Sequence, residues 1–239
     1  MSEPFAHQLL TGKVKEVGEH GAADPMDRAW KSGMFKEVKT EPIYLSKTGL
    51  VGDEVADTKV HGGPEKAIFA HPSSHYEYWE KDLQIDTMRI GAMGENIALE
   101  HGDESTFCIG DIYQFGEAII QVSQPRQPCW KPARRFRVKD LALRIQNTGR
   151  TGWYFRVLQE GNVKAGDVLQ LMERPHPKWT ITACNEVMHV YKNDLQLAEE
   201  LAGIPELAES WKKTLMKRLR GQQSSIEKRV YGPNMEVGR

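Results

Sequence analysis

The chain has 239 residues, of which 39% are hydrophobic and 27% are charged, and its formal net charge is −1. This length suits one full domain with a small appendage and allows a sizeable core. A net charge near zero argues against bulk binding to nucleic acid polymers or membranes, so a basic site must be local. No stretch approaches the ~18 apolar residues that cross a bilayer, and the first residues lack a secretory pattern. Three cysteines without regular spacing indicate a reducing compartment, and we expect a cytoplasmic protein.

Short apolar or alternating segments recur between residues 12 and 174, separated by glycines. Many short strands with turn signals predict a mainly β barrel or sandwich, not a doubly wound sheet. The expected strands cover residues 13–17, 43–45, 96–99, 111–115, 118–122, 153–158 and 168–172. Two helices are expected to interrupt them: one begins at Ser73 or Ser74 and ends near Leu83, and the other runs from Lys139 to Gln146.

The character of the chain changes at Pro175 and Pro177, which form a stiff connector. Residues 178–221 have apolar residues at helical spacing and predict a small three-helix domain. The first helix is capped by Thr182 and extends through residue 191, the second covers residues 195–202, and the third covers residues 206–219. Residues 222–239 lack a clear period, and we expect a peripheral tail there.

The loop that follows the expected strand 118–122 has the clearest chemical signal. It contains Pro125 and Pro128, which restrict the backbone, and it ends at Cys129. No acidic residue lies between Glu117 and Asp140. The basic residues in that interval are Arg126, Lys131, Arg134, Arg135, Arg137 and Lys139. Such surroundings lower the pKa of a thiol and attract anions.

The alternative for any cysteine is a buried, inert side chain. Cys108 and Cys184 fit that alternative because apolar residues flank them. Cys129 does not, because its neighbours are Pro128 and Trp130 and a lysine follows. We therefore predict a thiolate beside a binding site for a phosphate-class ligand.

A second segment with candidate binding residues contains His61, Gly62 and Gly63, flanked by Lys59 and Lys66. Consecutive glycines allow close backbone approach and can form an anion-binding nest of N–H groups. A sharp turn without function is the alternative, and for an isolated Gly-Gly pair it is the more common one. A hydrolytic pair of Cys129 with His61 is also conceivable, although nothing in the spacing favours it.

Two further patterns have ordinary structural explanations. His71 and His75 are four residues apart, but Pro72 lies between them, no glutamate is adjacent and no third ligand is evident. We interpret them as surface or core histidines, not as metal ligands. The cations of the last helix, Lys212, Lys213, Lys217, Arg218 and Arg220, complement the helix dipole and need no RNA partner.

Taken in order, several motifs resemble the MOSC family, the domain related to the C-terminal part of molybdenum cofactor sulfurase. They are residues 50–53, residues 59–64, Gly94-Glu95-Asn96, Gly110-Asp111 and residues 121–129. Within that family the chain looks like the bacterial YiiM-type proteins, which carry a three-helix domain after the barrel. The resemblance extends from about residue 12 to residue 221. It departs in the loop 22–34 and in the tail, and we expect neither departure to touch the motifs.

The resemblance implies a MOSC-type β-barrel that binds the molybdenum cofactor (molybdopterin), with Cys129 as the protein ligand to the metal. As a hypothesis for the mechanism, catalytic roles fall to Cys129, as the metal ligand, and to His61, which would deliver a proton unless a nearby lysine does so. The implied cofactor-binding residues are Lys59, His61, Gly62, Gly63, Glu95, Asn96, Arg126, Cys129, Lys131, Asn147 and Arg150. It also implies barrel and helical domains at residues 12–174 and 178–221.

The implied activity is an oxidoreductase that reduces N-hydroxylated compounds such as hydroxylamino purines, a detoxification reaction. The chain lacks a Gly-x-Gly-x-x-Gly motif after a strand, so the electrons would come from a separate flavoprotein. Two other functions stay open: a sulfur or molybdenum-cofactor carrier that uses Cys129, and a non-catalytic module for a phosphorylated small molecule. The three helices could cover the barrel mouth, dock the flavoprotein or form a homodimer contact.

Overall fold

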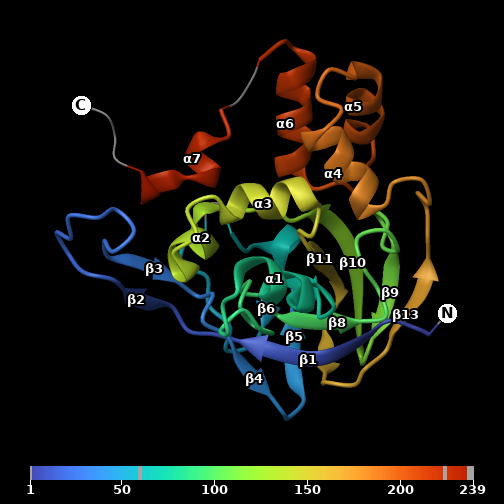
Figure 1. The fold of residues 1–239 in the computed structure, drawn as a ribbon. Helices are drawn as coiled ribbons and strands as arrows, with labels where there is room; N and C mark the ends of the chain where they lie inside the picture. Colours follow the sequence, from blue (N-terminus) through green and yellow to red (C-terminus); the bar gives the residue numbers. More distant parts are fainter. Residues whose placement is uncertain (1, 59–60, 223–224, 236–239) are drawn as a thin grey trace.

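A curled β-sheet dominates the computed structural model, which describes residues 2–58, 61–222 and 225–235 (Figure 1). In this part of the chain the sheet has eight strands. In sheet order they are β13 (Leu169–Glu173), β9 (Ile112–Phe115), β10 (Ala118–Pro125), β11 (Trp153–Gln159), β7 (Ile68–Pro72), β8 (Ile97–Glu100), β1 (Phe5–Thr11) and β4 (Glu37–Lys39).

Neighbouring strands are antiparallel, except that β7 and β8 pair in parallel. A bridge between Phe5 and Val168 brings the start of β1 against the segment that enters β13, so the sheet closes at this corner as a half-barrel. Smaller sheets join β12 (Gly161–Val163), β5 (Ile43–Ser46) and β6 (Gly49–Leu50), and β2 (Lys15–Val17) with β3 (Trp30–Ser32). The predicted mainly β barrel is confirmed.

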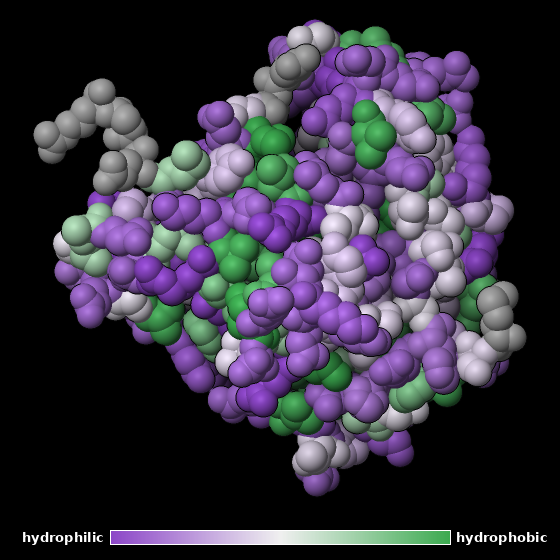
Figure 2. Space-filling view, viewed as in Figure 1, coloured by the Kyte–Doolittle hydropathy of each residue, from purple (hydrophilic) through white to green (hydrophobic). Residues whose placement is uncertain are grey.

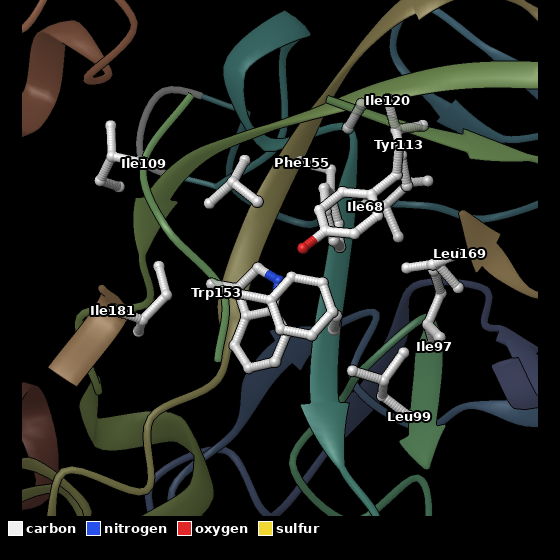
Figure 3. Close-up of a cluster of buried hydrophobic side chains, with 14 of the residues drawn as sticks. Ile68, Ile97, Leu99, Ile109, Tyr113, Ile120, Trp153, Phe155, Leu169 and Ile181 are labelled. Atoms are coloured by element: carbon white, nitrogen blue, oxygen red, sulfur yellow. The ribbon is translucent and has the colours of Figure 1, made fainter. Parts of the chain in front are cut away.

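The interior of the half-barrel is filled by aliphatic and aromatic side chains from opposite strands (Figure 3). Phe107 lies 4.4 Å from Trp153 and 5.0 Å from Tyr113, measured between ring centroids. Trp153 and Phe155, two residues apart in β11, both face the interior, because side chains along a strand alternate between its two faces. These large buried rings supply much of the hydrophobic stabilisation, because each removes 150–250 Å² of side chain from water, to order of magnitude.

Helices α1 (His75–Leu83), α2 (Trp130–Phe136) and α3 (Leu141–Thr148) share a second apolar cluster. Trp79 of α1 and Ile145 of α3 are fully buried in it. The predictions of α1 and α3 are confirmed, and Ser74 occupies the predicted N-cap position of α1 without a side-chain capping bond. We did not expect α2, because Pro132 and three cations obscure its short apolar pattern. Pro132 is tolerated in the first turn, where its missing N–H has no helical partner.

Helices α4 (Ile181–His189), α5 (Leu195–Ala202) and α6 (Glu209–Leu219) pack together beyond α3, at one end of the molecule (Figure 1). The three predicted helices are confirmed, but the predicted cap of the first is wrong. Thr180, not Thr182, is the N-cap residue, and its hydroxyl accepts a hydrogen bond from the Ala183 amide at 3.0 Å. Burial of Ile181 places the helix start two residues earlier than the sequence pattern suggested.

Two predicted boundaries also change. Strand β1 precedes residue 12 yet pairs with both β8 and β4, so the sheet begins earlier than expected. The tail is not simply peripheral: α7 (Glu227–Val230) and the short 3-10 helix η2 (Gly232–Asn234) pack near α2. Val230 and Asn234 are buried there, although the segment is too short to show a helical period in the sequence.

The described residues include no helix that is long and apolar enough to span a bilayer. On the face of the molecule seen in Figure 2, hydrophilic residues predominate and hydrophobic residues form separate groups.

Candidate functional site

A cavity of about 400 Å³ lies where several loops meet strands of the sheet. This volume falls in the range of small-molecule sites, roughly 300–1,000 Å³. Its walls combine apolar side chains with glycine backbone and several charged groups. The lining residues come from the segments 32–36, 46–56, 61–67, 93–96 and 126–132, together with Phe69 and Tyr154.

Cys129 lies on the cavity wall as the N-cap residue of α2, in extended conformation. Its side chain hydrogen-bonds to His61, which lies in the cavity wall in a separate loop. Burial raises the pKa of the Cys129 thiol, but the hydrogen bond and electrostatic attraction of His61, together with the charge of Arg126, outweigh burial and lower it to about 6. The thiolate is therefore the main form at neutral pH. The low pKa of the thiol has its cause chiefly in His61, a partner that the sequence analysis considered conceivable but that no spacing favoured.

Arg126 is a buried cation of the cavity wall, with only 6% of its surface exposed. Its guanidinium lies 4.9 Å from the centroid of the Phe69 ring and hydrogen-bonds to Tyr154. Within the described part of the chain, its Nη1 atom has no hydrogen-bond partner. An unmet buried donor costs about 1–3 kcal/mol or more when charged. Arg126 is thus suited to an anionic group bound in the cavity.

A buried polar network forms another part of the cavity wall. Asp53 accepts a hydrogen bond from the Gly12 amide at 2.7 Å and forms an ion pair with Lys36. Asn96 donates to Asp53 Oδ2 at 2.8 Å, and its Oδ1 accepts from the Phe69 amide at 3.1 Å. Burial lowers the pKa of Lys36, and Asp53 opposes that shift. The network leaves Asn96 fixed in orientation at the cavity wall.

The glycine segment also contributes to the wall. Gly62 and Gly63 have φ values of 79° and 83°, a conformation that non-glycine residues rarely adopt. Gly62 lines the cavity, and Gly63 is the N-cap residue of the short helix η1 (Pro64–Lys66). Lys66 and Lys131 also line the cavity. Lys59, the other predicted cation here, lies outside the described residues.

Gly63 and three predicted side chains, those of Glu95, Asn147 and Arg150, are not among the residues that line the cavity. Glu95 is fully buried, where its Oε1 accepts hydrogen bonds from Tyr76 and the Gly91 amide, each at 2.6 Å. Burial raises its pKa. Asn147 is exposed near the end of α3, and the Arg150 guanidinium stacks on Tyr78 at 3.8 Å. The structure therefore does not bring these three side chains together with Cys129.

The cations after Cys129 are mostly used for structure and not for anion binding. Arg134 donates to Asn234 and to two backbone carbonyls, and Arg135 donates to the carbonyls of Met34, Gly91 and Ala92. Arg137 pairs with Asp24 and Asp27. Of this basic group, only Arg126 and Lys131 line the cavity. The predicted basic field is thus smaller than the sequence suggested, because folding supplies acceptors from distant segments.

We interpreted His71 and His75 as surface or core histidines, and His71 lies in the core whereas His75 is partly buried beside it. His71 is fully buried, and its burial lowers its pKa well below the usual value. His75 pairs with Glu104 at 2.7 Å, and Glu104 also accepts from the Gly152 amide. No cluster of three or more His, Cys, Asp or Glu side chains that could hold a metal ion occurs in the described residues.

The sequence missed two parts of the site. Ser32, Gly33 and Met34 line the cavity, so the expectation that the loop 22–34 stays away from the motifs is wrong. Lys36 was also missed, and only its long-range ion pair with Asp53 marks it. The tail reaches the cysteine loop as well: Arg229 donates to the Pro128 carbonyl. No local sequence pattern predicts these contacts, because each joins segments that are far apart in the chain.

The fold and cavity define a β half-barrel with a cavity of small-molecule size that is lined by a low-pKa thiol, followed by a helical domain. Residues 57–170 match the model of the MOSC domain, and residues 179–222 match that of the YiiM-like 3-alpha helix domain. The chain is 38% identical over 193 residues to the Protein YiiM of Escherichia coli, and the match covers 80% of this chain and 86% of that protein. The structure of YiiM from Geobacillus stearothermophilus has a TM-score of 0.75 and 34% identity, covering 90% of this chain and 99% of that one.

A longer relative, named "Reductase", from Gibberella moniliformis is 37% identical over 201 residues. The match covers 83% of this chain but only 34% of that protein, so most of the relative has no counterpart here. These similarities place the chain in the MOSC family, among its YiiM-type members with a three-helix domain. A function related to the molybdenum cofactor follows from this membership.

Proposed function

We propose that this protein is a molybdenum-cofactor-dependent reductase of N-hydroxylated compounds, hydroxylamino purines included. The single observation that carries the proposal is the low-pKa Cys129 thiol at the wall of a cavity that also holds the buried Arg126, whose Nη1 atom has no hydrogen-bond partner among the described residues. A soft thiolate suits a transition metal that already carries sulfur ligands. The reductase name of the relative from Gibberella moniliformis supports the reaction class.

The residues of the cavity fit the cofactor. The free Nη1 of Arg126 and the ammonium of Lys131 suit a phosphate, and the Gly62 backbone admits a flat ring at close approach. Cys129 would be the protein ligand to the metal. When bound, the cofactor supplies two-electron, oxygen-transfer chemistry that no side chain in the described residues can supply. Glu95, Asn147 and Arg150 are left out of this binding set because they do not line the cavity.

The chain itself binds the substrate and moves protons. Reduction of an N–OH group breaks the N–O bond, consumes two electrons and two protons, and releases an amine and water. We assign proton delivery to a ring nitrogen of His61, because His61 lines the cavity beside the thiol. The electrons would come from a separate flavoprotein. All three cysteines are free thiols, in keeping with the cytoplasm.

The test is molybdenum and pterin analysis of the protein purified from a cofactor-producing host. The wild type is expected to hold near-stoichiometric metal and to reduce hydroxylamino purines with a flavoprotein donor. Cys129→Ser should lose the metal. Cys184→Ala, which removes a buried thiol in α4, is the matched control and should keep it. A Cys129→Ser protein with bound cofactor and full activity would refute the ligand role.

A sulfur-carrier function is the second candidate, and the Cys129–His61 contact favours it, since a thiolate beside an imidazole can accept a sulfur atom. Incubation with a cysteine desulfurase and cysteine should then add one sulfur atom to Cys129, visible by intact-protein mass spectrometry. Transfer of that sulfur to an acceptor without reductase turnover would select the carrier function over the reductase.

A further inference from the structure

Side chains from the C-terminal part of the chain bind three backbone carbonyls of the loop that carries Cys129. The Trp211 indole donates to the Pro125 carbonyl at 3.1 Å, and Asn234 Nδ2 donates to the Trp130 carbonyl at 3.0 Å. Between them, Arg229 Nη1 donates to the Pro128 carbonyl, immediately before Cys129. These partners are 86 to 104 residues apart in sequence. The loop is therefore held from outside on both sides of the thiol.

Two of the three donors belong to residues 225–235, which we call the C-terminal strap. The strap passes Trp130 at Gly232, where an added Cβ would lie 2.2 Å from Trp130 Cδ1 and the φ value is 49°. Asn234 is 3% exposed and also accepts a hydrogen bond from Arg134 Nε at 2.7 Å. The strap and α2 are thus in close contact, and the strap lies against the residues on either side of Cys129.

Arg229 connects three parts of the molecule. Its Nη1 binds the Pro128 carbonyl, and its Nη2 donates to Gln146 Oε1 of α3 at 2.6 Å. The neighbouring Val230 is fully buried and anchors α7. The charge of Arg229 also interacts electrostatically with Cys129. A planar guanidinium with two directed bonds fixes geometry better than a single ammonium does.

We propose that Arg229 is a positioning residue for Cys129: by binding Pro128 and Gln146 together, it fixes the loop so that the thiol points into the cavity. The C-terminal strap then contributes to the functional site and does not only pack against the barrel. This inference rests on the proposed function only for the identity of the ligand, the metal that the Cys129 thiol would bind. A positioned thiol matters because misplacement of about 1 Å can cost a hundredfold in rate.

The strap can be tested apart from the reaction, by hydrogen–deuterium exchange on the full chain. Arg229→Gln removes the charge and the two-pronged bonding, and Arg229→Lys keeps the charge and one donor. Lys228→Gln is the matched control, because Lys228 is exposed on the same short helix. Loss of a charge-assisted hydrogen bond is expected to speed exchange of the amides of residues 126, 127 and 129–131 by roughly tenfold or more in Arg229→Gln.

The second readout is molybdenum content after expression in a cofactor-producing host. We expect it to fall in Arg229→Gln, to recover in part in Arg229→Lys and to stay at the wild-type level in Lys228→Gln. Native exchange of the loop in Arg229→Gln would overturn the proposal, and so would faster exchange spread equally over the β-sheet. Faster loop exchange with unchanged metal content would also overturn the positioning role. If the wild type binds no molybdenum, the proposed function fails, and the exchange data still decide whether the strap fixes the loop.

Discussion

The ion pair between Lys36 and Asp53 gives the sharpest prediction about stability. Its side chains are 5% and 11% exposed, and both groups line the cavity. Asp53→Asn keeps the shape of the side chain but removes the charge that balances the buried ammonium. Breaking a buried pair costs roughly 3–5 kcal/mol. Because water can reach the cavity, we take the lower end and expect a loss of about 3 kcal/mol in the free energy of unfolding.

The pH dependence of this loss provides a second check. Burial lowers the pKa of Lys36 from 10.5, and the Asp53 carboxylate opposes that shift. The cost of an unpaired ammonium is fully present below the folded-state pKa and disappears as the lysine becomes neutral. The stability gap between wild type and Asp53→Asn should therefore be widest near pH 7 and narrow as pH rises toward 10.5.

Urea denaturation at several pH values measures both effects. Glu77→Gln is the control, since it removes a carboxylate from an exposed pair with Lys81 in which both side chains are 75% exposed. Such surface pairs contribute little, and the control should unfold at nearly the wild-type midpoint. If Asp53→Asn behaves like Glu77→Gln, or if the gap does not depend on pH, the pair is solvated and our account of its burial is wrong.

Two more predictions concern the thiol and a helix cap. Iodoacetamide at pH 7, followed by mass spectrometry, should modify Cys129 but not the buried Cys108, whose pKa burial raises to about 11. The rate of Cys129 modification should fall as pH drops through about 6, and His61→Gln should slow it roughly tenfold at pH 7. An unchanged rate in His61→Gln would mean that His61 does not set the pKa of the thiol. Thr180→Ala should lower the free energy of unfolding by about 1 kcal/mol through loss of the α4 cap, and Thr182→Ala should change it much less; equal effects on the denaturation midpoint would contradict the cap assignment.

The general fold could be predicted because its signals are local. Period-two burial along β11 and three- to four-residue apolar spacing along α5 and α6 appear directly in the sequence. Cys129 also stood out locally, since prolines and a basic neighbourhood distinguish its loop from the apolar surroundings of Cys108 and Cys184. Helix α2 and the strap were missed because each is too short to establish a period.

The membership of the site was decided by tertiary structure. Lys36, Asp53 and Asn96 meet only because β4, β6 and β8 bring their loops and ends together, and the partners of Asp53 are 17 to 43 residues away. Arg134 and Arg135 look like anion ligands in sequence, yet folding gives them carbonyl partners. Composition can show that a cation is present, but its burial and its partners determine whether it binds a ligand or stabilises the fold. The sequence by itself therefore determined the half-barrel, the helices and the cysteine with the lowered pKa, whereas the contacts of distant segments selected the residues that surround it.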